Sequence, residues 1–178
     1  MASERWSRPA RILHWSVACL VPLQLWLGWA AEGEADRTHA FRLISVHFQI
    51  GCSLFVLMVL RLSWRVAKGH PQAIVPEPMW RRLAAGGVHG SLYALLLILP
   101  ASGYVIWIWM DAPRFWLGFF ELPKLFEPPH DDESSRALAW YIHHYCAYAI
   151  TGLALLHIAI ALWRELFWRD GVITRRML

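Results

Sequence analysis

The sequence has few cysteines and lacks the motifs in which cysteine binds cofactors. Only three of its 178 residues are cysteine, at positions 19, 52 and 146, and no two of them form a C-x-x-C pair. Neither a disulfide framework nor a thiolate metal site is therefore indicated. The absence of C-x-x-C-H excludes a covalently attached c-type haem.

Charged side chains are missing from the longest apolar stretch. Residues 140–163 contain no Asp, Glu, Lys or Arg, and a Trp stands at each end. A helix of that length exceeds the roughly 30 Å hydrocarbon thickness of a bilayer, which predicts a transmembrane span. Further spans are predicted at residues 14–31, 43–66 and 84–109. With 57% apolar residues, the sequence predicts an all-α bundle of four transmembrane helices, in one integral membrane domain over residues 1–178.

Basic residues are distributed unequally between the two sides of this bundle. Twelve lie in the N-terminus, the link between the second and third spans, and the C-terminus, whereas five lie in the other two loops. The positive-inside rule therefore places both termini in the cytoplasm. The net charge of +4 has this origin and does not indicate nucleic-acid binding.

The long outer connection, residues 111–139, contains an apolar run and an acidic cluster. The run, residues 114–126, is expected to lie as an interfacial helix or to cap the bundle. The cluster consists of Asp131, Asp132 and Glu133. A negative field there would favour a basic partner.

The fourth span carries three histidines, which are costly at membrane depth and usually functional there. His143 and His157 are fourteen residues apart. At about 100° and 1.5 Å per residue, their rings leave the same helix face about 21 Å apart. His144 points about 140° away from that face. One helix thus offers an imidazole near each membrane surface on a single stripe.

Two other spans offer histidines at matching depths. His14 stands at the inner edge of the first span and His47 near the outer edge of the second, which predicts an inner pair with His157 and an outer pair with His143. Two imidazoles facing each other across a helix bundle are typical axial ligands of a b-type haem, each fixed by a hydrogen bond from its other ring nitrogen.

Simpler interpretations stay open for single residues. A lone histidine at a membrane edge is commonly an interfacial residue, so the haem interpretation depends on four histidines at matched depths. Gly51 and Gly152 either make room for porphyrin or serve ordinary helix packing. The histidines in loops are expected to be solvated: His39, His70 and His130.

Several motifs in this order resemble the bacterial cytochrome b561 family. They include R-x-L-H-W at residues 11–15, S-V-H-x-x-x-G at residues 45–51 and F-W-R-D-G-V-I-T-R-R-M at residues 167–177. That family is similar to the cytochrome b subunits of nickel-iron hydrogenases and formate dehydrogenases. The resemblance implies a multi-pass protein of the bacterial inner membrane that exchanges electrons with the quinone pool. It also implies two haem b groups with iron ligands His14, His157, His47 and His143.

The resemblance also suggests where quinone reacts. Many relatives carry a histidine pair near positions 164 and 165, where this chain has Arg164 and Glu165. A cytoplasmic quinone site is therefore expected at these two residues together with His89 and Trp163. Arg164 would stabilise anionic forms of quinone, and Glu165 or His89 would supply the proton because Arg stays charged.

The sequence allows two kinds of partner on the outer side, a small anion or a basic protein. Family members of this length include superoxide oxidases, which take an electron from superoxide and reduce ubiquinone. A possible patch for that anion consists of Arg37, His39 and Arg42. The acidic cluster at residues 131–133 favours instead a basic protein such as a soluble cytochrome c.

Two other classes of membrane protein also use histidines within their spans. A cytochrome b subunit that anchors a larger dehydrogenase would keep the same haems but have no activity alone. A metal-ion transporter would need carboxylates or other polar groups along a path through the spans, and the span interiors offer almost none.

Overall fold

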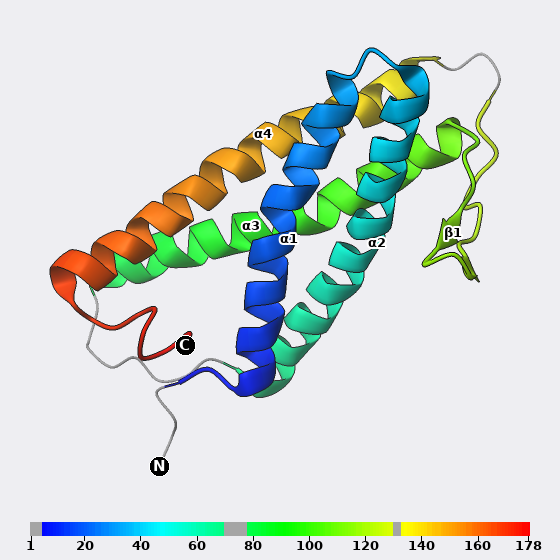
Figure 1. Cartoon of the computed structure of the whole chain (residues 1–178). Helices are drawn as coiled ribbons and strands as arrows, with labels where there is room; N and C mark the ends of the chain where they lie inside the picture. The colour runs from blue at the N-terminus through cyan, green and yellow to red at the C-terminus, as the bar shows by residue number, and fades with distance from the viewer. Residues whose placement is uncertain (1–4, 70–77, 130–132) are drawn as a thin grey trace.

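The computed structural model describes residues 5–69, 78–129 and 133–178. These residues contain four long helices, α1 (Arg8–Glu32), α2 (Arg37–Lys68), α3 (Met79–Trp109) and α4 (Glu133–Trp163). Each is long and apolar enough to cross a membrane, which confirms the predicted all-α bundle of four spans (Figure 1). A short π-helix, η1 (Arg164–Trp168), continues α4.

Each predicted span lies inside one helix, but the helices extend beyond the apolar residues that predicted them. α1 begins at Arg8 with a proline in its first turn, where the missing N–H has no intrahelical partner to lose. α2 begins at Arg37 because the Asp36 carboxylate accepts a hydrogen bond of 2.7 Å from the His39 N–H. These local signals lie in polar sequence outside the apolar runs.

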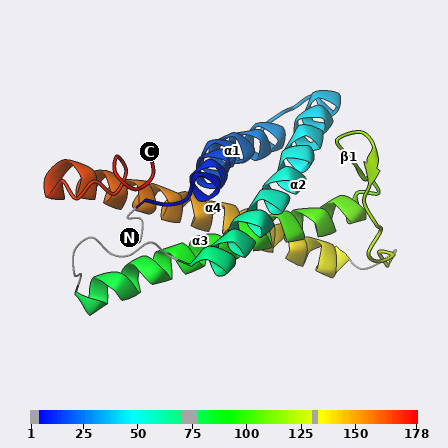
Figure 2. The same cartoon turned by 90° about the horizontal axis from the view of Figure 1, so that it is seen from below.

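The helices form two antiparallel pairs, α1 with α2 and α3 with α4, and α2 also packs against α3. Figures 1 and 2 show that the first residues of α1 and the last residues of α4 lie at the same end of the molecule, together with the two chain termini. We call this the terminal end, and the opposite end, which contains the α1–α2 and α3–α4 connections, the loop end. The last residues return to α1, where the Met177 carbonyl accepts a hydrogen bond of 3.0 Å from the Trp15 indole.

The buried residues form two clusters between the helices. Val17, Leu54 and Met58 join α1 and α2 near the terminal half. Phe48 stacks on Trp107 with ring centroids 4.2 Å apart, joining α2 and α3. Outward-facing apolar side chains remain exposed, as in α4, where Leu155 is 63% exposed. Such faces are suited to contact with lipid.

The apolar run at residues 114–126 contains a β-hairpin, so of the two alternatives for this run the interfacial helix is wrong. Strand β1 (Phe115–Trp116) pairs antiparallel with β2 (Phe120–Glu121). Leu117 and Gly118, between the strands, have φ values of 55° and 79°. Positive φ values reverse the chain within the hairpin and are incompatible with a right-handed helix.

The hairpin lies against the side of α2 near the loop end (Figure 1). The Gln49 amide donates to the Phe115 carbonyl at 2.7 Å and accepts from the Leu117 N–H at 2.8 Å. The Trp116 indole donates to the Ser53 hydroxyl at 3.1 Å. Polar side chains within the second span thus find their partners in the hairpin. Residues 130–132 lie outside the described part of the chain, so His130, Asp131 and Asp132 have no structural account, and the same holds for His70.

Candidate functional site

His47 of α2 and His143 of α4 face each other near the loop end. Their ring centroids are 5.9 Å apart and their planes meet at 70°. Two imidazoles on opposite sides of one metal ion place their ring centroids roughly 6 Å apart, because each metal–nitrogen bond is about 2 Å long. The spacing of this loop-end pair therefore fits two axial ligands of one iron.

Backbone carbonyls orient both rings of the loop-end pair. The His47 Nδ1 donates to the Gln24 carbonyl at 3.0 Å, and the His143 Nδ1 donates to the Leu99 carbonyl, also at 3.0 Å. A carbonyl only accepts, so the proton of each neutral ring lies on Nδ1 and the lone pair on Nε2. This is the arrangement that holds a metal-binding histidine in one tautomer and one orientation.

Two glycines that sequence reasoning missed make room for these rings. A Cβ added at Gly28 of α1 would lie 3.2 Å from His47 Cε1, and a Cβ added at Gly103 of α3 would lie 3.0 Å from His143 Cε1. For Gly51 and Gly152, room for porphyrin and ordinary helix packing both stay open. Gly51 faces the Gln24 amide at 3.1 Å, and Gly152 has open space around it. The sequence signal for such a position is a glycine on the span next to the one that carries the histidine, as Gly28 is for His47 and Gly103 for His143.

His14 of α1 and His157 of α4 lie together toward the terminal end. Their ring centroids are 6.4 Å apart and their planes meet at 83°. This spacing also fits two ligands of one iron by the same bond-length argument. His89 of α3 packs edge-on against His157, with centroids 5.3 Å apart. The terminal-end pair therefore has a third imidazole beside it.

An arginine distinguishes the terminal-end pair from the loop-end pair. The Arg61 guanidinium donates to His14 Nδ1 at 2.7 Å and, through Nε, to the Tyr93 hydroxyl at 3.1 Å. Because Arg has no acceptor, His14 Nδ1 accepts in this arrangement. For His14 to bind iron through Nε2, its proton must lie on Nδ1. The Arg61–His14 hydrogen bond must then break, while Arg61 keeps its hydrogen bond to the Tyr93 hydroxyl.

His144 lies away from both pairs, as the helical phase predicted. Its ring stacks on Trp140 with centroids 4.5 Å apart, and its Nδ1 lies 3.9 Å from a Glu32 carboxylate oxygen. Among the described residues, no group of three or more His, Cys, Asp or Glu side chains is placed to hold a bare metal ion. The two histidine pairs are therefore two-ligand sites, which suits iron that a porphyrin already binds in its plane.

The residues expected to bind quinone do not lie together: two contact the C-terminal segment, and His89 contacts the terminal-end pair. Arg164 forms an ion pair of 2.7 Å with Asp170, and the Glu165 carboxylate accepts from the Ile173 N–H and the Thr174 hydroxyl at 2.9 and 2.6 Å. Both residues thus hold the C-terminal segment. Trp163 is exposed and contacts Phe167, while His89 lies against His157.

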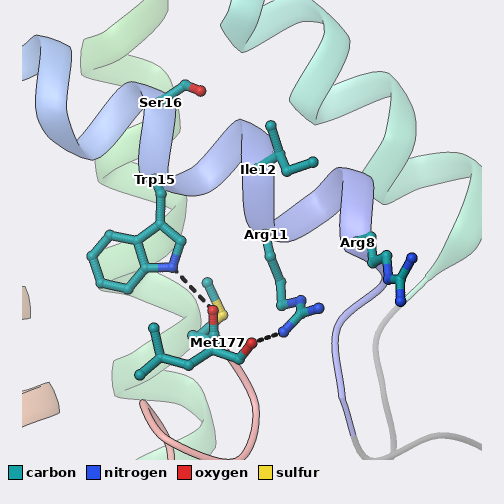
Figure 3. Close-up of a pocket in the computed structure, with 7 residues that line it drawn as sticks. Arg8, Arg11, Ile12, Trp15, Ser16 and Met177 are labelled. Atoms are coloured by element: carbon teal, nitrogen blue, oxygen red, sulfur yellow. Dashed lines mark hydrogen bonds between the residues drawn. The ribbon is translucent and has the colours of Figure 1, made fainter.

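An open pocket of about 500 Å³ lies beside the first turns of α1 (Figure 3). Its lining combines two arginines with apolar side chains and the end of the C-terminal segment: Arg8, Arg11, Ile12, Trp15, Ser16, Met177 and Leu178. Arg11 donates to the Leu178 carbonyl. The Trp15 ring packs against His14 with centroids 5.3 Å apart, so the pocket adjoins the terminal-end pair.

The three basic residues expected to attract an anion outside are all exposed at the start of α2, but one has an acidic partner. His39 Nδ1 lies 2.6 Å from a Glu34 carboxylate oxygen. The Asp36 N–H and then His39 lower the pKa of Glu34, so this carboxylate stays negative. Arg37 and Arg42 are both exposed in this patch, and the Glu34 carboxylate opposes their positive charge.

Comparisons with known proteins identify the family of the chain. The family model of prokaryotic cytochrome b561 matches residues 5–178. "Cytochrome b561 homolog 2" of Escherichia coli (strain K12) is 26% identical over 175 residues, which cover 98% of this chain and 92% of that protein. "Probable superoxide oxidase CybB" of Yersinia pestis is 27% identical over 172 residues, covering 93% and 91%.

A third relative, "Cytochrome b562" of Cereibacter sphaeroides, is 26% identical over 171 residues, covering 93% of this chain and 90% of that protein. These matches extend along nearly the whole chain and include α1, α2 and α4, the three helices that carry the histidine pairs. The chain therefore belongs to the prokaryotic cytochrome b561 family and is a multi-pass bacterial membrane haem protein.

Proposed function

We propose that the protein is a di-haem b electron-transfer protein of the bacterial inner membrane that exchanges electrons with the quinone pool, with both termini in the cytoplasm. The observation that carries this proposal is the presence of two facing histidine pairs at different depths, with centroid separations of 5.9 and 6.4 Å. The ligands would be His47 with His143 at the loop end and His14 with His157 at the terminal end.

The chain's own residues hold these ligands and separate the two sites. When bound, a haem b with two imidazole ligands supplies one-electron transfer at its porphyrin edge and has no open position for substrate. The Gln24 and Leu99 carbonyls keep the proton on Nδ1 of their histidines, so that Nε2 is free for iron. α4 holds His143 and His157 about 21 Å apart along its axis.

The first prediction is the cofactor content of the purified protein. We expect two b-type haems per chain, extractable by acid acetone because no thioether bond attaches them. Pyridine haemochrome absorbance against protein concentration measures this ratio, and a spectrum after addition of ubiquinol tests exchange with quinone. One haem per chain, or none, would contradict the paired-ligand proposal.

We propose superoxide as the donor on the outer side, with ubiquinone as the acceptor. The support is a relative named as a probable superoxide oxidase and the exposed Arg37 and Arg42 at the loop end. The alternative is a cytochrome b that anchors a larger dehydrogenase or serves a soluble cytochrome c, which the negative Glu34 beside His39 favours. Haem reduction by superoxide, with superoxide dismutase added as the control, distinguishes these alternatives.

Two surfaces near the terminal end are candidates for the quinone site. One consists of Arg164, Glu165, Trp163 and His89, where a fixed cation would stabilise anionic quinone. The other is the pocket in Figure 3, which is lined by Arg11 and by Trp15, whose ring packs against His14 of the terminal-end pair. An apolar pocket with a few polar groups is the usual form of a small-molecule site.

The second prediction separates these surfaces. Arg164→Ala should retain both haem spectra and slow ubiquinol-coupled haem reduction by about tenfold or more, because a charge that stabilises quinone anions is lost. Arg164→Lys should recover part of the rate. Stopped-flow absorbance at the haem bands measures both.

Asp170→Asn is the matched control, since it breaks the 2.7 Å ion pair but keeps the cation. If Asp170→Asn slows the reaction as much as Arg164→Ala does, the ion pair has only a structural role. If Trp15→Leu slows the reaction and Arg164→Ala does not, quinone reacts in the pocket beside α1.

A further inference from the structure

The two histidine pairs lie in opposite electrostatic surroundings. At the loop end, both rings donate Nδ1–H to backbone carbonyls, from Gln24 and Leu99. At the terminal end, His14 lies 2.7 Å from a guanidinium nitrogen of Arg61. One pair therefore faces the negative ends of carbonyl dipoles, and the other faces a full positive charge.

Arg61 is held at this position by contacts that do not involve histidine. Its Nε donates to the Tyr93 hydroxyl at 3.1 Å, and its guanidinium carbon lies 5.6 Å from the centre of the Tyr93 ring. Arg65, one turn further along α2, lies over the same ring at 5.0 Å. Tyr93 thus fixes two cations between α2 and α3, beside the terminal-end pair.

The loop-end pair lies among uncharged sequence. The stretches of its four helices that surround it, residues 15–31, 43–60, 84–109 and 140–163, contain no Lys or Arg. Along α2 the nearest basic residue toward the loop end is Arg42, five positions before His47 and exposed. The difference in charge between the two sites therefore originates mainly in α2, where Arg61 lies fourteen residues after His47.

A charge difference of this kind changes reduction potentials. Adding an electron to a haem makes it more negative, and a fixed cation nearby stabilises the reduced form, more strongly in a low dielectric than in water. A carbonyl that accepts the ligand's N–H makes the imidazole a stronger electron donor, which stabilises the oxidised form. Both effects raise the potential at the terminal end relative to the loop end.

We propose that Arg61 is the residue that makes the terminal-end haem the stronger electron acceptor, so that electrons pass from the loop end to the terminal end. The inference rests on the proposed di-haem function and assigns to Arg61 the role of favouring the proposed direction, from an outer donor to quinone near the terminal end. The transfer moves one electron from the loop-end iron to the terminal-end iron, with no bond made or broken. A one-electron donor outside supplies the electron, and quinone near the terminal end receives it.

The test is a potentiometric titration of the reconstituted protein followed by optical absorbance. In a His47→Ala background, which leaves the terminal-end haem to be observed alone, Arg61→Gln should lower its midpoint potential by about 59 mV or more. This shift is a tenfold change in the ratio of reduced to oxidised haem for one electron. Arg61→Lys should shift it by much less, because the charge is kept.

Matched variants separate a charge effect from a structural one. Arg82→Gln removes an exposed cation from the same end of α3 and should leave the potential unchanged. Tyr93→Phe removes the hydroxyl that holds Arg61 and should lower the potential in the same direction as Arg61→Gln. If the Arg61→Gln protein no longer binds the terminal-end haem, its potential cannot be measured. A lowered potential in Tyr93→Phe, together with a much smaller shift in Arg61→Lys, then supports the charge effect.

Two results would overturn the inference. One is that Arg61→Gln or Tyr93→Phe shifts the midpoint potential of the terminal-end haem by no more than the control Arg82→Gln does. The other is a terminal-end haem whose potential lies below that of the loop-end haem, measured alone in a His14→Ala background. Either result leaves the di-haem proposal standing, because that proposal fails only if the purified protein contains fewer than two haems.

Discussion

Replacing His143 with alanine is expected to remove the loop-end haem, whereas replacing the adjacent His144 should retain both haems. The His143 ring faces His47 across the bundle and is held by the Leu99 carbonyl, while the His144 ring stacks on Trp140. The measurement is the haem-to-protein ratio of each purified variant by pyridine haemochrome. The remaining haem should keep the optical spectrum of the terminal-end site.

The complementary substitutions provide the controls. His47→Ala should have the same effect as His143→Ala, and His14→Ala and His157→Ala should both remove the terminal-end haem instead. A protein that loses haem with His144→Ala but keeps its full content with His143→Ala would show that a different face of α4 carries the ligands.

Filling the space at Gly103 is the second change for which we expect a large effect. A Cβ at this position would lie 3.0 Å from His143 Cε1, closer than ordinary van der Waals contact. Gly103→Ala should weaken loop-end haem binding, and Gly103→Leu should abolish it, because the longer side chain takes the place of the imidazole. The haem-to-protein ratio should fall from two to one, with no change in the terminal-end spectrum.

Gly90 offers the matched control on the same helix. A Cβ added there meets no atom within 4 Å, so Gly90→Ala and Gly90→Leu should keep both haems. Because both glycines lie within α3, the two series change helix propensity to a similar extent. Full haem loading in Gly103→Leu would show that the histidine has room to move and that this glycine does not position it.

The sequence was sufficient to predict which histidines meet. Helical phase separates His143 from His144 by about 100°. The position of a residue along its span also sets the depth at which the residue lies in the membrane. His14 and His47 therefore had one plausible partner each, and the structure places them beside His157 and His143. That these pairs bind iron stays a prediction.

Features that depend on how the spans face each other could not be read from the sequence. The sequence shows only that Arg61 lies near the inner end of the second span, whereas the structure places it against His14 and Tyr93, two residues on other helices. Gly28 and Gly103 were not considered, because a glycine acts here through the side chain of a neighbouring helix. Such contacts depend on how each helix is rotated about its own axis relative to its neighbours. The apolar periodicity of the sequence does not determine that rotation.

The hairpin at residues 115–121 was missed for a different reason. Its aromatic and apolar residues suit an interfacial helix as well as a strand pair, because a run of seven residues has no decisive period. The positive φ values of Leu117 and Gly118 and the hydrogen bonds to Gln49 and Ser53 determine the outcome. Arg164 is similar, since its partner Asp170 becomes available only where the chain turns back after η1.

One consequence follows from α4 carrying a histidine of each pair on a single unbroken helix. Inserting or deleting one residue between His143 and His157 would turn one histidine about 100° away from its partner and shift it by about 1.5 Å. Only changes of about one helical turn, three or four residues, or multiples of it restore the facing, and the smallest of these already alters the separation by about 5 Å, roughly a sixth of the bilayer core. Short insertions or deletions between these two histidines are therefore expected to separate one of the two pairs, whereas substitutions around them leave the interval unchanged.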